Sequence, residues 1–136
     1  MTGTILIRNG RPMGGATADI LIEHGRIAAI GARLAAPDGI TVEDGGGALA
    51  LPGLIEGHAH IGKTLWGMGW VPNDVGPTIR DRIDTERRFR AATNHDARAQ
   101  SERIAREYLA NGTTRLRTFV DIDTDAGLKH LHAVLA

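Results

Sequence analysis

The chain has 136 residues, which is within the range of one ordinary domain. Lys and Arg together number 16, and so do Asp and Glu, so the formal net charge is zero. This balance argues against a nucleic-acid or anionic-membrane surface, because such surfaces need a basic excess. Cysteine is absent, which excludes disulfides, thiolate metal sites and a cysteine nucleophile and leaves nitrogen and oxygen as the only metal-binding atoms.

The sequence also bears on where in the cell the protein is found. No apolar run approaches the ~20 residues of a membrane span. Segment 1–11 lacks the long apolar core of a signal peptide, so a cytoplasmic location is expected. The 18 glycines and the scarcity of aromatic residues favour many tight turns over a large aromatic core.

The first 50 residues predict a small all-β unit. His24-Gly25 lies between two short apolar runs and predicts a two-residue hairpin. We interpret His24 as a solvent-facing turn residue rather than a ligand. Asn9-Gly10 predicts a turn at the end of the first strand. The predicted strands are 4–10, 19–23, 26–31 and 40–43.

A short apolar run after Pro52-Gly53 ends in two histidines, His58 and His60. Side chains alternate faces along a strand, so these two rings would point the same way and could chelate one ion. On a helix they would lie roughly 200° apart and could not. Imidazole suits zinc, iron, copper or nickel. A bare His-x-His pair is common by chance, but the Pro-Gly break and the small neighbouring residues favour a metal site.

Segment 66–77 carries two tryptophans, three glycines and two prolines, which predicts a long loop. Loops that follow a metal-binding strand often contact substrate. Trp66 and Trp70 are candidates for that contact, and packing of the loop is an equally good interpretation. Lys63 is a third candidate.

Two helices and then a strand and helix follow. The pattern predicts a helix over 78–92, whose arginines read as a solvated face, and a second helix capped at Thr93 and ended by Asn111-Gly112. A strand over 113–122 and a helix over 125–136 come next. The second His-x-His, at 130–132, lies on that helix, so its rings diverge and we reject it as a chelate. The strand–helix rhythm predicts βα units and a parallel sheet.

The chain resembles the amidohydrolase superfamily in its small β unit, in segment 19–31 and in Leu51-Pro52-Gly53 leading to His58-Ala59-His60. Within it, the chain is similar to the cytosine deaminase branch, which includes N-isopropylammelide isopropyl amidohydrolase-like proteins. The segments that carry this likeness are 63–65, 70–73, 78–83 and 112–121.

The resemblance implies a fold and a function. The fold is α/β: residues 53–136 would be strands one and two, with their helices, of a (β/α)₈ metal-dependent hydrolase barrel, and residues 1–52 part of a small β-sandwich. His58 and His60 would be ligands of one divalent ion, zinc or iron, at the C-terminal face of the barrel. Its activated water would hydrolyse a non-peptide C–N bond of a small cyclic nitrogen-rich substrate, as amidohydrolases and deaminases do. Asp121 would either contact a metal-binding histidine without touching the metal or have a structural role at the end of its strand.

Two positions depart from the branch. Gly62 stands where the branch usually has Asp, and Phe119 stands where it usually has His. Neither is a family metal ligand, so they affect substrate identity more than metal binding. Phe in place of His makes the pocket more apolar.

A barrel of this kind needs about 250 residues, and two histidines fall short of the usual three protein ligands. We therefore expect this chain to be the N-terminal part of a longer enzyme, inactive alone and completed by the rest of its own chain or by a complementary fragment. A homo-oligomer also fits, since the branch often assembles. The rival hypothesis is a non-catalytic structural or assembly protein that uses the amidohydrolase fold without the metal.

Overall fold

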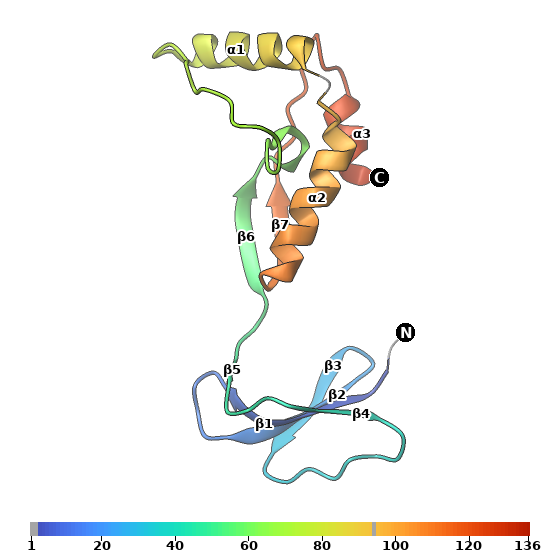
Figure 1. Ribbon diagram of the computed structural model, residues 1–136. Helices are drawn as coiled ribbons and strands as arrows, with labels where there is room; N and C mark the ends of the chain where they lie inside the picture. The colour runs from blue at the N-terminus through green and yellow to red at the C-terminus, as the bar shows by residue number, and fades with distance from the viewer. Residues whose placement is uncertain (1–2, 94) are drawn as a thin grey trace. The chain divides into compact units, whose positions relative to one another are not determined.

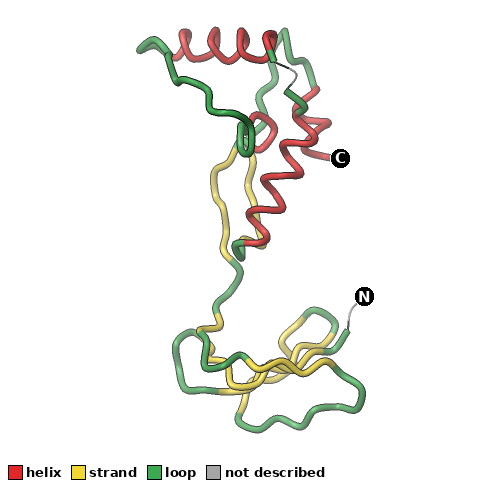
Figure 2. Tube along the Cα trace, in the orientation of Figure 1, coloured by secondary structure: helices red, strands yellow, loops and turns green. Residues whose placement is uncertain are grey.

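The computed structural model describes residues 3–93 and 95–136. The chain divides into two compact units, Met1–Pro52 and Gly53–Ala136 (Figure 1). The first consists of strands and loops, and the second contains all the described helices and two further strands (Figure 2).

The first unit is a five-stranded sheet in the order β3-β2-β1-β4, with β5 also paired to β1. Strands β1, β2 and β3 are antiparallel neighbours, whereas β4 and β5 run parallel to β1. Leu6 and Ile20 are its buried apolar residues, which is a small core for a sheet of this size. The strands are β1 (Ile5–Pro12), β2 (Ala18–Glu23), β3 (Arg26–Gly31), β4 (Thr41–Asp44) and β5 (Leu49–Ala50).

A buried carboxylate holds this sheet to its loops. Asp19 is 5% exposed and accepts hydrogen bonds from Arg8 Nη1 at 2.8 Å, from the Asn9 backbone N–H at 3.2 Å and from the Leu34 backbone N–H at 3.0 Å. Burial of a charge is tolerable only with such partners.

The predicted hairpin is confirmed, and the predicted Asn9-Gly10 turn is wrong. His24 and Gly25 have φ of 51° and 74°, the pair of positive angles that a type I′ turn requires. Strand β1 instead continues to Pro12. Asn9, with φ of 55°, lies at a register shift between β1 and β2, because Asn accepts the left-handed conformation and can form a bulge inside a strand.

The second unit contains two parallel strands, β6 (Leu54–Ala59) and β7 (Thr113–Thr118), which confirms the predicted parallel pairing. Gly53 lies where they first meet, and a side chain there would clash with Thr114. Between the strands the chain forms a short 3₁₀ helix, η1 (Ile61–Lys63), and two α-helices, α1 (Ile79–Ala92) and α2 (Ala97–Ala110). Helix α3 (Lys129–Leu135) follows β7.

Helix α2 lies alongside the strands and packs on β7, η1 and α3 (Figure 1). The predicted α/β class is therefore confirmed. The complete barrel and the β-sandwich stay predictions.

The cap predicted for α2 is wrong by three residues. Asp96 is the N-cap, and its carboxylate accepts hydrogen bonds from the Arg98 and Ala99 backbone N–H groups. Thr93 is instead the C-cap of α1, and its hydroxyl donates to the Phe89 carbonyl at 2.8 Å. Both residue types are common helix caps, and the sequence alone does not show which of the two helices each one caps.

The last strand and helix are shorter than predicted. Strand β7 ends at Thr118 rather than Ile122, and α3 begins at Lys129 rather than Asp125. A turn takes the intervening residues: Asp123 accepts hydrogen bonds from the backbone N–H groups of Asp125 and Ala126 at 2.9 and 2.7 Å. Such local side-chain bonds compete with helix formation.

Only part of each predicted apolar stripe is half-buried, and the rest is exposed. Periodicity in the sequence predicts the stripes at Ala97, Ile104, Ala105, Tyr108 and Leu109 for α2 and at Leu128, Leu131, Val134 and Leu135 for α3. Leu109 of α2 and Leu135 of α3 are 66% and 74% exposed. The small or polar residues Gln100, Ser101 and His130 are buried instead. Helix packing here therefore uses a face that a purely apolar periodicity does not identify.

We predict that Thr78→Ala destabilises α1. Thr78 and Asp81 form a reciprocal capping box, with the Asp81 N–H donating to Thr78 Oγ1 at 3.1 Å and the Thr78 N–H to the Asp81 carboxylate at 2.9 Å. Loss of such a cap costs about 1 kcal/mol. The free energy of unfolding is measured with urea on the protein expressed from its full reading frame. Thr78→Ser, which keeps the hydroxyl, is the control. Equal midpoints for the alanine and serine variants would contradict the prediction.

Candidate metal-binding site

The site lies where β6 and β7 end. The carboxyl ends of parallel strands meet at one edge of a sheet, and Ala59 pairs with Thr118 at that edge. The Phe119 N–H donates to the Ala59 carbonyl at 2.8 Å, and the Ile61 N–H donates to Thr118 Oγ1 at 3.2 Å. These bonds fix the two chain segments beyond the strands against each other.

His58 and His60 come together at this edge, with ring centroids 5.4 Å apart. The prediction that the strand carries both is wrong in detail: β6 ends at Ala59, and His60 follows it as the N-cap of η1 with φ of −130°. The backbone is still extended enough at this point for the two rings to lie side by side rather than to face apart. Their role as metal ligands stays a prediction.

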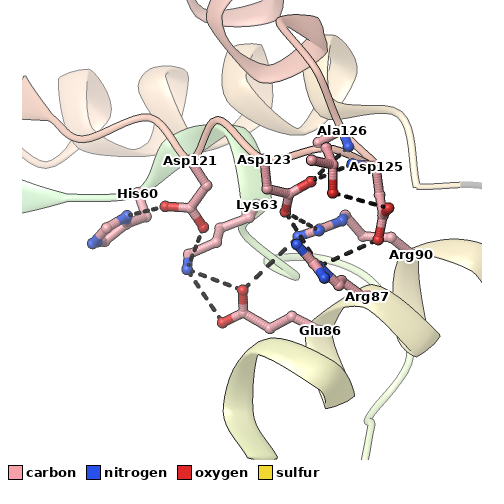
Figure 3. Close-up of polar contacts among 10 residues, drawn as sticks. His60, Lys63, Glu86, Arg87, Arg90, Asp121, Asp123, Asp125 and Ala126 are labelled. Carbon is pink, nitrogen blue, oxygen red and sulfur yellow. Dashed lines mark hydrogen bonds and ion pairs between the residues drawn. The ribbon is translucent and has the colours of Figure 1, made fainter. Parts of the chain in front are cut away.

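The residues present fit part of a metal site. Nδ1 of His60 is buried and has no hydrogen-bond partner among the described residues. It faces Asp121 Oδ1 at 3.6 Å, which is longer than a hydrogen bond (Figure 3). Metal-ligating histidines usually donate their second ring N–H to a carboxylate, and Asp121 lies on that side of the His60 ring. Within residues 3–93 and 95–136, no group of three or more metal-binding side chains is arranged around one ion, so further ligands are needed.

Phe119 forms an apolar wall beside both imidazoles. Its ring centroid lies 4.5 Å from that of His58 and 5.8 Å from that of His60. The Arg117 guanidinium carbon lies 4.9 Å from the centroid of the Phe119 ring, a cation–π distance. The Phe119 ring is therefore directly at the site.

Lys63 connects the site to α1. Its Nζ lies 2.8 Å from Asp121 Oδ2 and 3.2 Å from both carboxylate oxygens of Glu86 (Figure 3). Burial lowers the pKa of Lys63, but the hydrogen bonds and charges of the two carboxylates outweigh burial, so the pKa lies above its ordinary value. Burial raises the pKa of Asp121, but the hydrogen bond and charge of Lys63 outweigh it and the pKa is lowered. Both groups are therefore charged at neutral pH.

Two of the α1 arginines belong to the same network, so their interpretation as a purely solvated face is wrong. Arg90 Nη2 donates to Asp123 Oδ2 at 2.8 Å, and Arg87 Nε lies 3.2 Å from Asp125 Oδ2. The sequence signal for these pairs is the alternation of aspartates at 121, 123 and 125 after a strand, beside an arginine-rich helix. The Arg pattern alone did not distinguish paired from solvated side chains.

Of the three candidate substrate-binding residues, only Lys63 lines a cavity. Trp66 and Trp70 are 54% and 86% exposed in a loop without helix or strand. A cavity of about 570 Å³ lies between this loop and α1, and Lys63 lines it whereas neither tryptophan does. Its lining includes Leu65, Val71, Pro72, Val75, Glu86 and Phe89. Packing and substrate contact stay open for the tryptophans.

Helix α2 holds the same loop in place. Arg103 Nη1 donates to the Gly67 carbonyl at 3.0 Å, and Gly67 has φ of 73°. A side chain at Gly67 would clash with the Arg103 guanidinium. The loop is therefore attached to the helix that packs on β7.

None of the helices formed by the described residues combines the length and apolar character needed to cross a membrane.

The chain is similar to several known proteins, although no protein-family model matches it. The crystal structure of N-isopropylammelide isopropylaminohydrolase from Burkholderia multivorans is 57% identical with a TM-score of 0.90, over 99% of this chain and 33% of that one. Atrazine chlorohydrolase TrzN from Arthrobacter aurescens, solved in complex with zinc, is 23% identical with a TM-score of 0.67, over 96% of this chain and 32% of that one, and it shares the fold. The uncharacterised protein YahJ of Escherichia coli is 31% identical over 121 residues, which are 85% of this chain and 26% of YahJ.

The chain thus spans about a quarter of the length of YahJ and a third of the two solved structures. The resemblance to the amidohydrolase superfamily is confirmed, and it applies to the N-terminal portion of those proteins.

We predict that Asp123→Asn lowers stability at neutral pH. The Ala126 N–H is the largest cause that holds the pKa of Asp123 below its ordinary value; burial opposes it, and the Asp125 N–H, Arg90 and Arg87 add to the lowering. A lowered pKa contributes stability above the unfolded value of about 3.9, and this is lost as the pH falls through the folded pKa.

The test is the urea midpoint at pH 7 and pH 3. The urea midpoint of Asp123→Asn should lie below that of wild type at pH 7, and the difference should be smaller at pH 3. The exposed control Asp74→Asn should have the wild-type midpoint at both pH values. A deficit of equal size at the two pH values would contradict the charge-based explanation.

Proposed function

We propose that this chain, which resembles the N-terminal third of amidohydrolase-superfamily proteins, supplies the first two metal ligands of a metal-dependent hydrolase of non-peptide C–N bonds. The observation that carries the proposal is the pair of imidazoles, His58 and His60, with centroids 5.4 Å apart at the common end of β6 and β7. The relative that is 57% identical over nearly the whole chain is a hydrolase by name, which supports the same class of activity.

The proposed architecture is the beginning of a (β/α)₈ barrel. Strands β6 and β7 would be barrel strands one and two, preceded in residues 1–52 by part of a β-sandwich. Chemistry in such barrels lies at the C-terminal face, and this is the edge at which His58 and His60 are found. A longer chain or a complementary fragment would supply the other strands, so we expect residues 1–136 alone to be inactive.

The metal would be one divalent ion, zinc or iron. His58 and His60 would hold it, and zinc in the structure of TrzN supports the choice of metal. A bound ion would act as the Lewis acid that makes water nucleophilic at neutral pH. The remaining ligands and the acid–base groups would come from outside the residues described.

The substrate would be a small, nitrogen-rich ring that carries an amino or alkylamino group. Phe119 makes the wall beside the two imidazoles apolar, and the cavity beside Lys63 has several aliphatic side chains. These features favour an alkyl substituent on the departing nitrogen, in line with the name of the 57% identical relative. A cytosine deaminase-like specificity is the alternative within the same branch.

Other parts of the proposal concern the whole protein. It would act on a small molecule rather than on nucleic acid or a membrane surface, in keeping with its zero formal charge. A cytoplasmic location and self-association also belong to the proposal. A non-catalytic assembly protein is the rival function, and the metal content of the purified protein separates the two.

We predict that His58→Ala and His60→Ala each abolish metal retention and turnover together. The experiment measures bound zinc and iron by mass spectrometry in protein expressed from its full reading frame. His24→Ala, at the hairpin of the first unit, is the matched histidine control and should retain wild-type metal. Full metal content in either site variant would remove that histidine from the ligand set.

We predict that Phe119→His shifts preference from an alkylamino-substituted ring toward an amino-substituted one. A polar side chain at this wall disfavours an alkyl group, and discrimination of this kind changes by about tenfold or more. The ratio of kcat/KM for the two substrates measures it at equal metal content. Phe119→Leu keeps the wall apolar and should preserve the ratio. An unchanged ratio in Phe119→His would contradict the proposed role.

A further inference from the structure

A line of neighbouring polar side chains runs from His60 to α1. His60 Nδ1 faces Asp121 Oδ1 at 3.6 Å, and the other oxygen of Asp121 lies 2.8 Å from Lys63 Nζ. Lys63 also reaches both oxygens of Glu86 at 3.2 Å (Figure 3). These residues come from three separate segments: the turn after β6, the segment after β7, and α1.

Each member of the line is only partly exposed. The side chains of Lys63, Asp121 and Glu86 are 29%, 30% and 44% exposed. An ammonium group has three donors, and here its partners are the Asp121 oxygen and the two oxygens of Glu86. The ammonium group of Lys63 is thus held between the carboxylates of Asp121 and Glu86.

Glu86 has a second, looser ionic neighbour on its own helix. Arg90, one helical turn further along α1, lies 3.9 Å from Glu86 Oε2 and donates to Asp123 at 2.8 Å. Asp123 in turn receives two backbone N–H groups of the turn before α3. Helix α1 is therefore connected to the segment after β7 through Arg87 and Arg90 directly and through Glu86 by way of Lys63.

We propose that Glu86 is a positioning residue for the metal centre, acting through Lys63 and Asp121 on the imidazole of His60. The inference rests on the proposed function, because it takes His60 to be a metal ligand. Glu86 does not touch the metal or the substrate in this role.

The physical reason is orientation. A carboxylate facing Nδ1 fixes the rotation and tautomer of an imidazole and so leaves Nε2 for the metal. Asp121 can do this only if it is held with one oxygen toward His60, and Lys63 holds the other oxygen. The lysine side chain is long and flexible, so its aim depends on a second partner, and Glu86 is that partner.

A different role is possible for the same pair, because Lys63 and Glu86 also line the cavity beside the loop. There they would contact substrate and leave the metal unaffected. Metal affinity measured without substrate distinguishes the two roles.

The test compares Glu86→Gln with Asp84→Asn in protein expressed from its full reading frame. Asp84 lies on the same helix, is about half-exposed and pairs only loosely with Arg80 at 3.9 Å. Zn²⁺ affinity is measured by competition with a chelator, and urea unfolding checks that both variants are folded. We expect about tenfold weaker Zn²⁺ binding in Glu86→Gln, the low end of the effect of outer ligand partners, and wild-type affinity in Asp84→Asn.

A second pair of variants tests the intermediate link. Lys63→Met breaks the line and should weaken Zn²⁺ binding by about tenfold or more, whereas Lys63→Arg keeps a cation with donors for both carboxylates and should restore most of the affinity. The visible absorption spectrum of the Co²⁺-loaded protein should change in Lys63→Met and Glu86→Gln but not in Asp84→Asn, since it reports the geometry of the ligands.

The outcomes separate the two levels of inference. Wild-type Zn²⁺ affinity and an unchanged Co²⁺ spectrum in folded Glu86→Gln overturn the positioning role and leave the proposed function standing. Equal losses in Glu86→Gln and Asp84→Asn also overturn it, since they indicate a general effect of α1. Absence of Zn²⁺ binding in the wild-type protein overturns both.

Discussion

The parallel pairing of β6 with β7 is the constraint on which the candidate site depends. Parallel strands present their carboxyl ends at the same edge, so the residues that follow each strand are brought together although they are about sixty positions apart in the sequence. Backbone hydrogen bonds from Phe119 to Ala59 and from Ile61 to Thr118 hold this edge together. The two imidazoles on one side and Phe119 and Asp121 on the other owe their proximity to that pairing.

Charge pairing organises the surroundings of this edge. The sequence has equal numbers of acidic and basic residues. Near this edge, Lys63, Arg87 and Arg90 are paired with carboxylates from other segments. Partly buried pairs of this kind contribute chiefly geometry, since the cost of removing charges from water offsets much of their attraction. The network therefore matters most for where the side chains point.

Local patterns in the sequence predicted what depends on local physics. The hairpin at His24-Gly25 follows from turn chemistry, the parallel strands from the strand–helix rhythm, and the proximity of His58 and His60 from side-chain alternation. The errors lie where two local signals compete: Thr93 and Asp96 are both good caps, and Asp123 diverts the chain into a turn before α3. The link from Lys63 to Glu86 was not predictable, because it joins residues of separate elements and depends on how α1 is placed. Phe119 was flagged only as a departure from the branch, and its contact with both rings required the fold.

The most direct test of the central claim is a crystal structure of the zinc-loaded protein, expressed from its full reading frame, with data collected at the zinc absorption edge. The account predicts an anomalous peak at the end of β6 and β7, with one nitrogen of His58 and one of His60 each about 2.0–2.1 Å from the ion. A fully occupied zinc site elsewhere, with both imidazoles free of the metal, would contradict it.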